Sequence, residues 1–459
     1  MSWFQIPPEI LERILTYLDV ESIKRLRLVN RSLSKDCVGP CFRSFTRQPT
    51  IDLTTESFAA VFNALLSIPW LEHSIHTLTI LATSFDSSNA ESMLAAGGRK
   101  VYDSDEDESD YVPYSTEELA DTQSELDWLD TQKEARGNES QDSIVDSLVL
   151  IFRRLKALNT IRLDAAILCG ANSKKSITAV RSPSPTWARA SQVHFMTMAA
   201  IVRSGISVSR PNIYRDTLRC SVPLNDYAAQ IASFSPGDIS ASFVNLDALE
   251  LSIASTERGD TRDTTTTEDN LPVISRLFKW TPKLRKLNLH VYRITGANPE
   301  IDDEIFTSLA DTTHLPLLQE YSLSGFYLPV ESLLQFLKKH PTIQHLALEE
   351  LILTSGSWKP VFTHLSRMPS LTRLHLSNIC HGDEGNVVNL YPVWQRKDPE
   401  DPSAYFPCLR GGLVVHTRSF TMEELQKGLE FKSSPRGRTM GSTNIAQWRR
   451  RRRAEYGPV

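Results

Sequence analysis

The chain has 459 residues, of which 41% are hydrophobic, so it is long enough to bury a large core and to form two or three domains. Its formal net charge of -5 at pH 7 excludes a strongly basic or acidic protein, so any electrostatic function must come from local charge runs. The six cysteines are scattered without a CxxC pair, which is typical of a reducing compartment and predicts no disulfides.

The N-terminal 45 residues predict a compact helical unit with an apolar stripe. Pro7 and Pro8 favour a helix start, because a missing amide donor costs nothing there. The positions that follow are apolar at helical spacing: Ile10, Leu11, Ile14, Leu15 and Leu18. A second helix is expected to turn three apolar residues inward and to keep its basic residues in water: Ile23, Leu26 and Val29 inward, and Lys24, Arg25 and Arg27 outward. A unit of this size usually completes its core on another protein.

The stretch from about Phe4 to Phe45 resembles the F-box, whose pattern begins Leu-Pro-x-Glu-Ile-Leu and continues through Leu-x-x-Leu-x-x-Val. The resemblance implies docking on the Skp-type adaptor of a cullin-based ubiquitin ligase, and hence a substrate-receptor subunit. Two positions depart from the family pattern, because Ile6 stands where Leu is preferred and Leu33 where Trp is common. The residues that match the adaptor-contacting pattern are Ile6, Pro7, Ile10, Leu11, Ile14, Leu18, Leu26 and Val29. The alternative is an ordinary helical hairpin that packs on its own chain.

Beyond residue 45 a short phrase of the form LxxLxL recurs, which predicts a repeat architecture. Clear copies begin at Leu246, Leu284, Leu318, Ile343 and Leu371, and weaker copies begin at Ile75 and Leu158. The apolar residues alternate with polar ones, as a strand with one buried face requires, and helix-like stretches lie between the strands, at Val330 to Lys339 and Lys359 to Arg367. The pattern resembles the leucine-rich-repeat class of F-box proteins. It implies an α/β fold in which a helical F-box is followed by an irregular leucine-rich-repeat solenoid, or horseshoe.

These patterns divide the chain into an F-box domain (1–45), a first repeat region (46–83), an acidic insertion (84–142), the repeat solenoid (143–379) and a C-terminal capping region with a basic tail (380–459). The insertion contains the run Asp103 to Asp110 and few aliphatic residues, so we expect it to be disordered. A shorter excursion of the same kind is expected from Glu257 to Asp269. The tail, Arg449 to Arg453, is expected either to contact the acidic run or to serve as a nuclear localisation signal or nucleic-acid contact.

Sequence motifs for catalysis are missing, since the chain has neither a GxSxG elbow nor a glycine-rich phosphate-binding loop. The pair His73-x-x-His76 and the neighbours Cys380 and His381 lack the four-ligand spacing of a structural zinc site. We therefore predict a non-catalytic subunit with no cofactor and no metal. The apolar runs are too short for a membrane span, and no signal peptide is recognised, which predicts a cytoplasmic and/or nuclear protein without a membrane partner.

The predicted role is to hold a protein substrate near a transferring enzyme. Substrate contacts are expected on the solvent side of the repeat strands, because residues between the buried positions must point outward. The predicted substrate-binding residues are Arg162, Glu250, Lys286, Asn288, His290, Arg373 and His375. The predicted partners are the adaptor, a cullin through it, and an unknown protein substrate, and nucleic acid is disfavoured as a partner. The alternative function is a non-degradative repeat scaffold that binds the adaptor without delivering a substrate.

Overall fold

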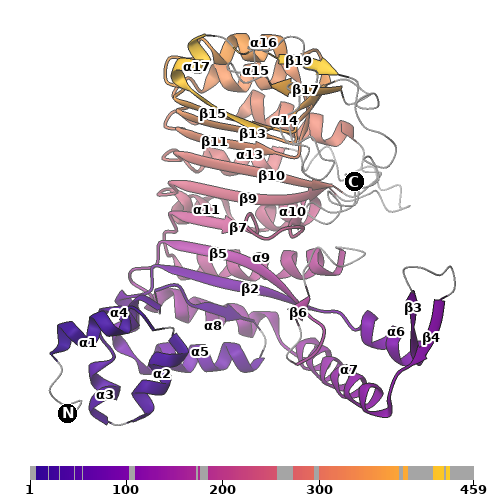
Figure 1. Cartoon of the computed structure of the whole chain (residues 1–459). Helices are drawn as coiled ribbons and strands as arrows, with labels where there is room; N and C mark the ends of the chain where they lie inside the picture. Colours follow the sequence, from indigo (N-terminus) through magenta and orange to yellow (C-terminus); the bar gives the residue numbers. More distant parts are fainter. Residues whose placement is uncertain are drawn as a thin grey trace.

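The computed structural model describes the chain at residues 7–18, 20–29, 31–45, 47–53, 55–102, 109–171, 174–175, 184–255, 272–293, 299–381, 386–390, 417–427, 429 and 431–434. The N-terminal part is helical and consists of α1 (Pro8–Leu15), α2 (Val20–Val29), α3 (Arg31–Asp36) and α4 (Pro40–Phe45) (Figure 1). As predicted, α1 starts at the proline pair. Glu9 in its first turn is favourable to the helix dipole. The four helices share a small core of their own, formed by Leu11, Leu15, Ile23, Leu33, Cys37 and Phe42.

The apolar stripe of α1 divides between two faces. Leu11 and Leu15, four residues apart, are buried against α2, α3 and α4, whereas Ile10 and Ile14 are exposed. Helix α2 also departs from the expected pattern. Val29 is exposed instead of inward-facing. Arg27, expected in water, is half-buried, because its guanidinium lies 4.5 Å from the centre of the Phe42 ring.

A twelve-stranded sheet forms the centre of the protein, and most of its strands are parallel. The strand order is β1-β2-β5-β7-β9-β10-β11-β13-β15-β18, with β6 beside β5 and β8 beside β9. Only β6 and β18 run antiparallel to their neighbours. The strands are β1 (Thr50–Asp52), β2 (Thr77–Phe85), β5 (Thr160–Leu168), β6 (Lys174–Lys175), β7 (Arg210–Ile213), β8 (Val222–Pro223), β9 (Ala248–Ser255), β10 (Lys286–Arg293), β11 (Glu320–Ser324), β13 (His345–Glu349), β15 (Arg373–Ser377) and β18 (Thr417–Thr421).

Helices connect successive strands and cover one side of the sheet (Figure 1). They are α5 (Thr55–Ser67), the 3-10 helix η2 (Pro69–His73), α8 (Gln141–Arg154), α9 (Ser184–Ser204), α10 (Leu224–Ser233), α11 (Pro236–Phe243), α13 (Pro272–Lys279), α14 (Pro299–Thr312), α15 (Val330–Lys339), α16 (Trp358–Leu365) and α17 (Met422–Gln426). The predicted helix Val330 to Lys339 coincides with α15. None of the described helices is both long enough and apolar enough to cross a membrane. The mainly parallel strands and the helices that connect them confirm the predicted mixed α/β fold with a large parallel sheet.

The recurring apolar phrase becomes a set of aligned strands. The central residue of each copy pairs with the next copy, which gives one continuous buried line across five strands: Leu249, Leu287, Tyr321, Leu346 and Leu374. The first residue of each copy lies just before its strand and is also buried, at Leu246, Leu284, Leu318, Ile343 and Leu371. These positions and the apolar helix faces form a single core. At about 1.5 to 3 kcal/mol for each large buried side chain, this core is the main favourable term for the sheet.

A smaller sheet is formed by the short strands that follow β11, β13 and β15 in the chain, together with β17 and β19. Its order is β12 (Tyr327–Pro329), β14 (Ile352–Ser355), β16 (Cys380–His381), β17 (Asn386–Leu390) and β19 (Phe431–Ser434). Trp358 at the start of α16 is fully buried, and its indole Nε1 donates a hydrogen bond to the Cys380 carbonyl oxygen at 2.8 Å. The chain from β11 to β16 therefore contributes strands alternately to the large sheet and to the small one.

The prediction of a disordered acidic insertion is wrong for the residues that the structure describes. Residues 84–142 contain α6 (Ser88–Ala96), the hairpin of β3 (Gly98–Tyr102) and β4 (Ser109–Pro113), and α7 (Thr116–Gly137), which lie beside the main sheet (Figure 1). Helix α7 begins with a capping box between Ser115 and Glu118. Residues 103–108 of the acidic run, the excursion at 257–269 and the tail at 449–453 lie outside the described residues.

Aromatic and cationic contacts attach the insertion to the sheet, and this explains why its composition was misleading. The Arg136 guanidinium lies 4.1 Å from the centre of the Phe85 ring and donates to the Thr83 carbonyl oxygen at 2.7 Å. The Trp128 ring packs edge-on against the same Phe85 ring at 6.3 Å. Burial lowers the pKa of Arg136 to about 10. The insertion has few aliphatic residues to bury, but these contacts help to offset the conformational entropy that it loses on ordering.

His340, at the end of α15, makes the stability of the core depend on pH. The ring is fully buried, Nδ1 donates to the Phe336 carbonyl oxygen at 2.7 Å, and Nε2 accepts from the Leu315 amide at 3.0 Å. Burial lowers the pKa of His340 to about 4. The folded protein therefore binds this proton less readily than the unfolded chain. The contribution of the neutral His340 ring to the free energy of unfolding is complete above pH 6.5 and is lost as the pH falls towards 4.

We predict that lowering the pH from 7.5 to 5.5 removes about 1.4 kcal/mol of unfolding free energy through His340 alone. The His340→Gln variant lacks this proton site but is less stable at pH 7.5, because buried bonds are lost. The difference in unfolding free energy between wild type and variant should therefore be smaller at pH 5.5 than at pH 7.5, by about 1.4 kcal/mol. Urea unfolding of both proteins at the two pH values measures the gap, and an unchanged gap would contradict the assignment.

Candidate functional site

Exposed apolar side chains are concentrated on the N-terminal helices. Five large hydrophobic side chains within twenty residues face solvent, although the described part of the chain has only twelve such residues. These side chains are Ile10, Ile14, Tyr17, Leu28 and Val29, and we call them together the helical patch. Leu28 is 86% exposed and Val29 is 67% exposed. Such a concentration of exposed apolar area on a small domain marks a protein-binding surface.

The predicted adaptor-binding residues fall into three groups in the structure. Pro7, Ile10, Ile14 and Val29 are exposed, Leu18 and Leu26 are half-buried against the core of the helical domain, and Leu11 is buried within it. Ile6 lies outside the described residues. Two members of the helical patch were missed by the sequence analysis. Tyr17 follows Ile14 at helical spacing, so its position could have been recognised, whereas the exposure of Leu28 depends on how α2 packs.

The open side of the large sheet carries three straight rows of side chains. Because the strands pair in register, equivalent positions align across the sheet at about 4.8 Å per strand. The first row is Ala248, Lys286, Glu320, His345, Arg373 and Thr421. The second row is Arg162, Asn212, Glu250, Asn288, Ser322, Ala347, His375 and Ser419. The third row is Ser252, His290, Ser324, Glu349, Ser377 and Thr417.

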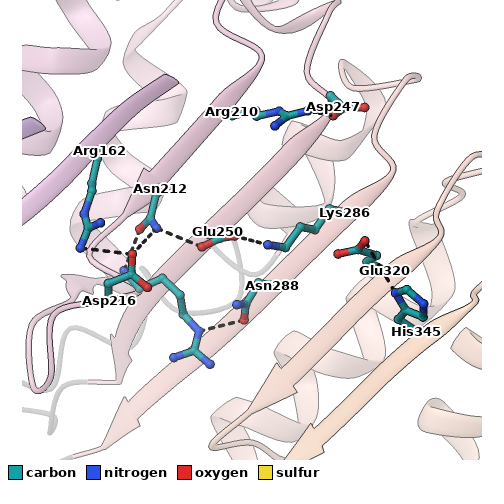
Figure 2. A network of polar contacts seen from close by, with 11 residues as sticks. Arg162, Arg210, Asn212, Asp216, Asp247, Glu250, Lys286, Asn288, Glu320 and His345 are labelled. Carbon is teal, nitrogen blue, oxygen red and sulfur yellow. Dashed lines mark hydrogen bonds and ion pairs between the residues drawn. The ribbon is translucent and has the colours of Figure 1, made fainter. Parts of the chain in front are cut away.

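Polar contacts link the rows into a network (Figure 2). Glu250 holds Lys286 by an ion pair of 2.5 Å and accepts from the Asn212 amide at 3.0 Å. Arg162 lies 3.3 Å from Asp216 and 3.9 Å from Asp164. Further pairs along the face are Arg210–Asp247, Arg285–Asp247, His345–Glu320 and His375–Glu349. Exposed pairs of this kind contribute about 0 to 1 kcal/mol each, so their main effect is to hold side chains in place.

The segment 214–221 crosses the open face and was not predicted. It connects the end of β7 to the start of β8. Tyr214 (φ 55°) and Arg219 (φ 61°) both lie in the left-handed region that non-glycine residues rarely adopt. The Trp187 indole Nε1 donates to the Arg219 carbonyl oxygen at 2.9 Å. The Arg219 amide donates to the Tyr292 hydroxyl oxygen at 2.6 Å. These buried bonds keep the segment on the sheet.

The segment covers Ser252 and His290 of the third row, and Ser324 of the same row is buried as well. The expectation that His290 faces solvent is wrong, since His290 is 4% exposed. Burial, and next the positive charge of Arg215, lower the pKa of His290 to about 3. Arg215 itself extends from the segment across the sheet, donating from Nε to the Asn288 Oδ1 at 2.9 Å and lying 3.8 Å from the Glu349 carboxylate.

The covered residues include a serine–histidine contact, which is the arrangement of a nucleophile and its base. The Ser252 hydroxyl oxygen lies 3.2 Å from the His290 Nδ1 and 2.7 Å from the Ser221 hydroxyl oxygen. Both Ser252 and His290 are buried, so a substrate could reach them only if the segment 214–221 opened. We assign these contacts to the packing of the segment. Within the described residues no group of three His, Cys, Asp or Glu side chains is arranged to hold a metal ion.

Two adjoining hollows lie in the uncovered part of the face. One, of about 570 Å³, lies over β5 to β11 and is lined by charged residues that include Arg210, Asp247, Glu250 and Arg285. The other, of about 540 Å³, lies over β10 to β18, and we call it the C-terminal hollow. The residues of the first two rows that line it are Lys286, Glu320, Ser322, His345, Ala347, Arg373, His375, Ser419 and Thr421. Lys286 and Glu320 lie at the boundary of the two hollows.

The structure thus places the predicted substrate-binding residues in different surroundings. Lys286, Arg373 and His375 line the C-terminal hollow, Glu250 and Lys286 line the other, and Arg162 and Asn288 belong to the network beside them. His290 lies beneath the segment 214–221. Arg215 is a residue of this surface that the sequence did not reveal, because no pattern marks a segment that folds back over a sheet.

Comparison with known proteins supports an assignment for the helical domain. The family model of the F-box domain matches residues 3–35, which span α1, α2 and most of α3. The chain therefore carries an N-terminal F-box domain, and F-box domains generally mediate binding to Skp-type adaptors. No curated protein matches the chain.

The anchoring of the segment 214–221 is testable with a pair of buried tyrosines. Tyr292→Phe removes the hydroxyl that accepts the Arg219 amide, which should cost about 1 to 3 kcal/mol of unfolding free energy and expose Arg215 and Arg219 to trypsin. Tyr321→Phe is the matched control, because the buried Tyr321 hydroxyl has no hydrogen-bond partner within the described part of the chain. Equal stability and equal tryptic cleavage of the two variants would show that the bond does not hold the segment.

Proposed function

We propose that the protein is the substrate receptor of a cullin-type ubiquitin ligase, with a leucine-rich-repeat solenoid following its F-box domain. The observation that carries the proposal is the combination of an F-box domain whose apolar patch is uncovered with a separate polar sheet face. The repeat assignment is supported by the aligned phrases, since each contributes one parallel strand and one connecting helix. In this account the protein is non-catalytic and acts in the cytoplasm, the nucleus or both.

The helical patch would dock on the adaptor. Burying an aliphatic side chain contributes about 1.5 to 3 kcal/mol before the costs of association. The small core of the helical domain is already complete, with Leu15 and Ile23 fully buried, so the patch is available to a partner without unfolding. The adaptor would in turn connect the chain to a cullin. The open face of the sheet would hold a protein substrate and raise its effective concentration near the transferring enzyme.

The adaptor role is tested by Ile10→Asp together with Leu28→Asp. Both side chains are exposed, so the helical domain should stay folded while a buried unpaired charge removes adaptor binding. Leu150→Asp, at an exposed leucine on α8, is the control for an added surface charge. Co-purification with a Skp-type adaptor should be lost in the double variant and kept in the control. Wild-type recovery of adaptor by the double variant would contradict the proposed docking surface.

A non-degradative scaffold that binds the adaptor is the second candidate, because the same two surfaces would serve it. Turnover separates the two candidates. If the protein is a receptor, a partner held by the sheet face should persist longer in cells that express only the Ile10→Asp/Leu28→Asp variant. A partner that binds both forms and decays at the same rate with each would favour the scaffold.

A further inference from the structure

We propose that the C-terminal hollow binds an extended protein segment by placing an anionic side chain of that segment against Arg373. The inference rests on the proposed receptor function and names the chemistry of its substrate. It is carried by three features of the open face: the shape of the hollow, the pairing of the charges that line it, and one guanidinium that is left unpaired.

The shape of the hollow follows from residue size along the rows. In the second row, Ser322 and Ala347 are the small residues between Asn288 and His375, and they form a low floor. The first row beside them has long side chains, Glu320, His345 and Arg373, which form a wall. From β10 to β15 the hollow crosses three strand spacings, about 14 Å. That distance accommodates about four residues of an extended chain.

The charges around the hollow are nearly all satisfied within the protein. Lys286 is held by Glu250 at 2.5 Å, and Glu349 lies between Arg215 at 3.8 Å and His375 at 3.7 Å. Glu320 lies 3.7 Å from the His345 ring. Lys286 and Glu349 therefore already have partners of opposite charge, whereas the contact between Glu320 and His345 pairs opposite charges only when the imidazole is protonated.

Arg373 is the exception. It is exposed and lines the hollow, and its guanidinium makes no hydrogen bond or ion pair with the described residues. Its neighbours in the first row are His345 and Thr421, neither of which is an acid. A guanidinium in this position presents several N–H donors to a planar or tetrahedral anion. The complementary partner is therefore a carboxylate or a phosphoryl group on a peptide whose backbone runs over Ser322 and Ala347.

The test uses the full chain mixed with a Skp-type adaptor and applied to arrays of ten-residue peptides. The central position of each peptide is Glu, phosphoserine, Gln or Lys, and the flanking positions are randomised. Retention of anionic peptides should exceed that of the Gln peptides by about tenfold, as expected for one charge-assisted contact. The Arg373→Gln variant should retain anionic and Gln peptides about equally. In the wild type the preference for anionic peptides should weaken as added salt screens the exposed site. Arg203→Gln, on the helix-covered side, should leave it unchanged.

Ala347→Leu locates the contact, because it fills the floor without changing charge and should reduce retention of all peptides alike. Preference for Glu alone identifies a carboxylate, and preference for phosphoserine alone identifies a phosphorylated segment. An undiminished anionic preference in Arg373→Gln, or equal retention of Lys peptides by the wild type, would overturn the inference. Adaptor capture is measured in the same samples, so loss of adaptor binding with an intact anionic preference would contradict the receptor function and leave this inference standing.

Discussion

The structure depends on the register between its parallel strands. Because residue pairs such as Leu287 and Tyr321 align strand after strand, a single apolar layer is buried under the connecting helices. The same register fixes the opposite face, since residues between the buried positions must align there as well. A slip of one residue in any strand would move its apolar side chains into water and its charged side chains into the core. Packing of the core therefore determines where the polar rows lie.

This constraint gives the chain two surfaces of different chemistry. The helical patch is apolar and belongs to a four-helix domain with its own core, whereas the open sheet face is polar and nearly charge-balanced. An apolar patch suits a stable, constant partner, because burial of apolar area is favourable and non-directional. A face of fixed charges suits selection between partners, because mismatched charges are penalised more strongly than matched ones are rewarded. The division matches the proposed roles of adaptor docking and substrate recognition.

Much of the fold could be predicted from the sequence, because it is expressed in local periodicity. The alternation around Leu346 and Leu348 predicts a strand, and the stripe from Val330 to Lys339 predicts α15. The order within residues 84–142 could not be predicted, since it depends on contacts such as Arg136 with Phe85 that join residues distant in sequence. Only the outline of the candidate site could be predicted from the sequence. Alternation places Arg373 on the open face, but the burial of His290 depends on the fold of the segment 214–221.

The exposed helical patch was predictable as a stripe but not as a surface. The sequence grouped Leu11 with Ile10, yet the packing of α1 against the core of the helical domain buries the first and exposes the second. Helical periodicity defines which residues share a face, and only the neighbouring helices determine which face remains in water. For the same reason Leu28, which follows no apolar repeat of its own, is among the most exposed hydrophobic residues of the domain.

The central claim is that adaptor docking and substrate binding use separate surfaces. Amide hydrogen exchange of the full chain, with and without a saturating Skp-type adaptor, tests it most directly. The account predicts increased protection confined to residues 7–45, with exchange unchanged in β9, β10, β11, β13 and β15. Protection of those strands by the adaptor, or no protection of α1 and α2, would contradict it.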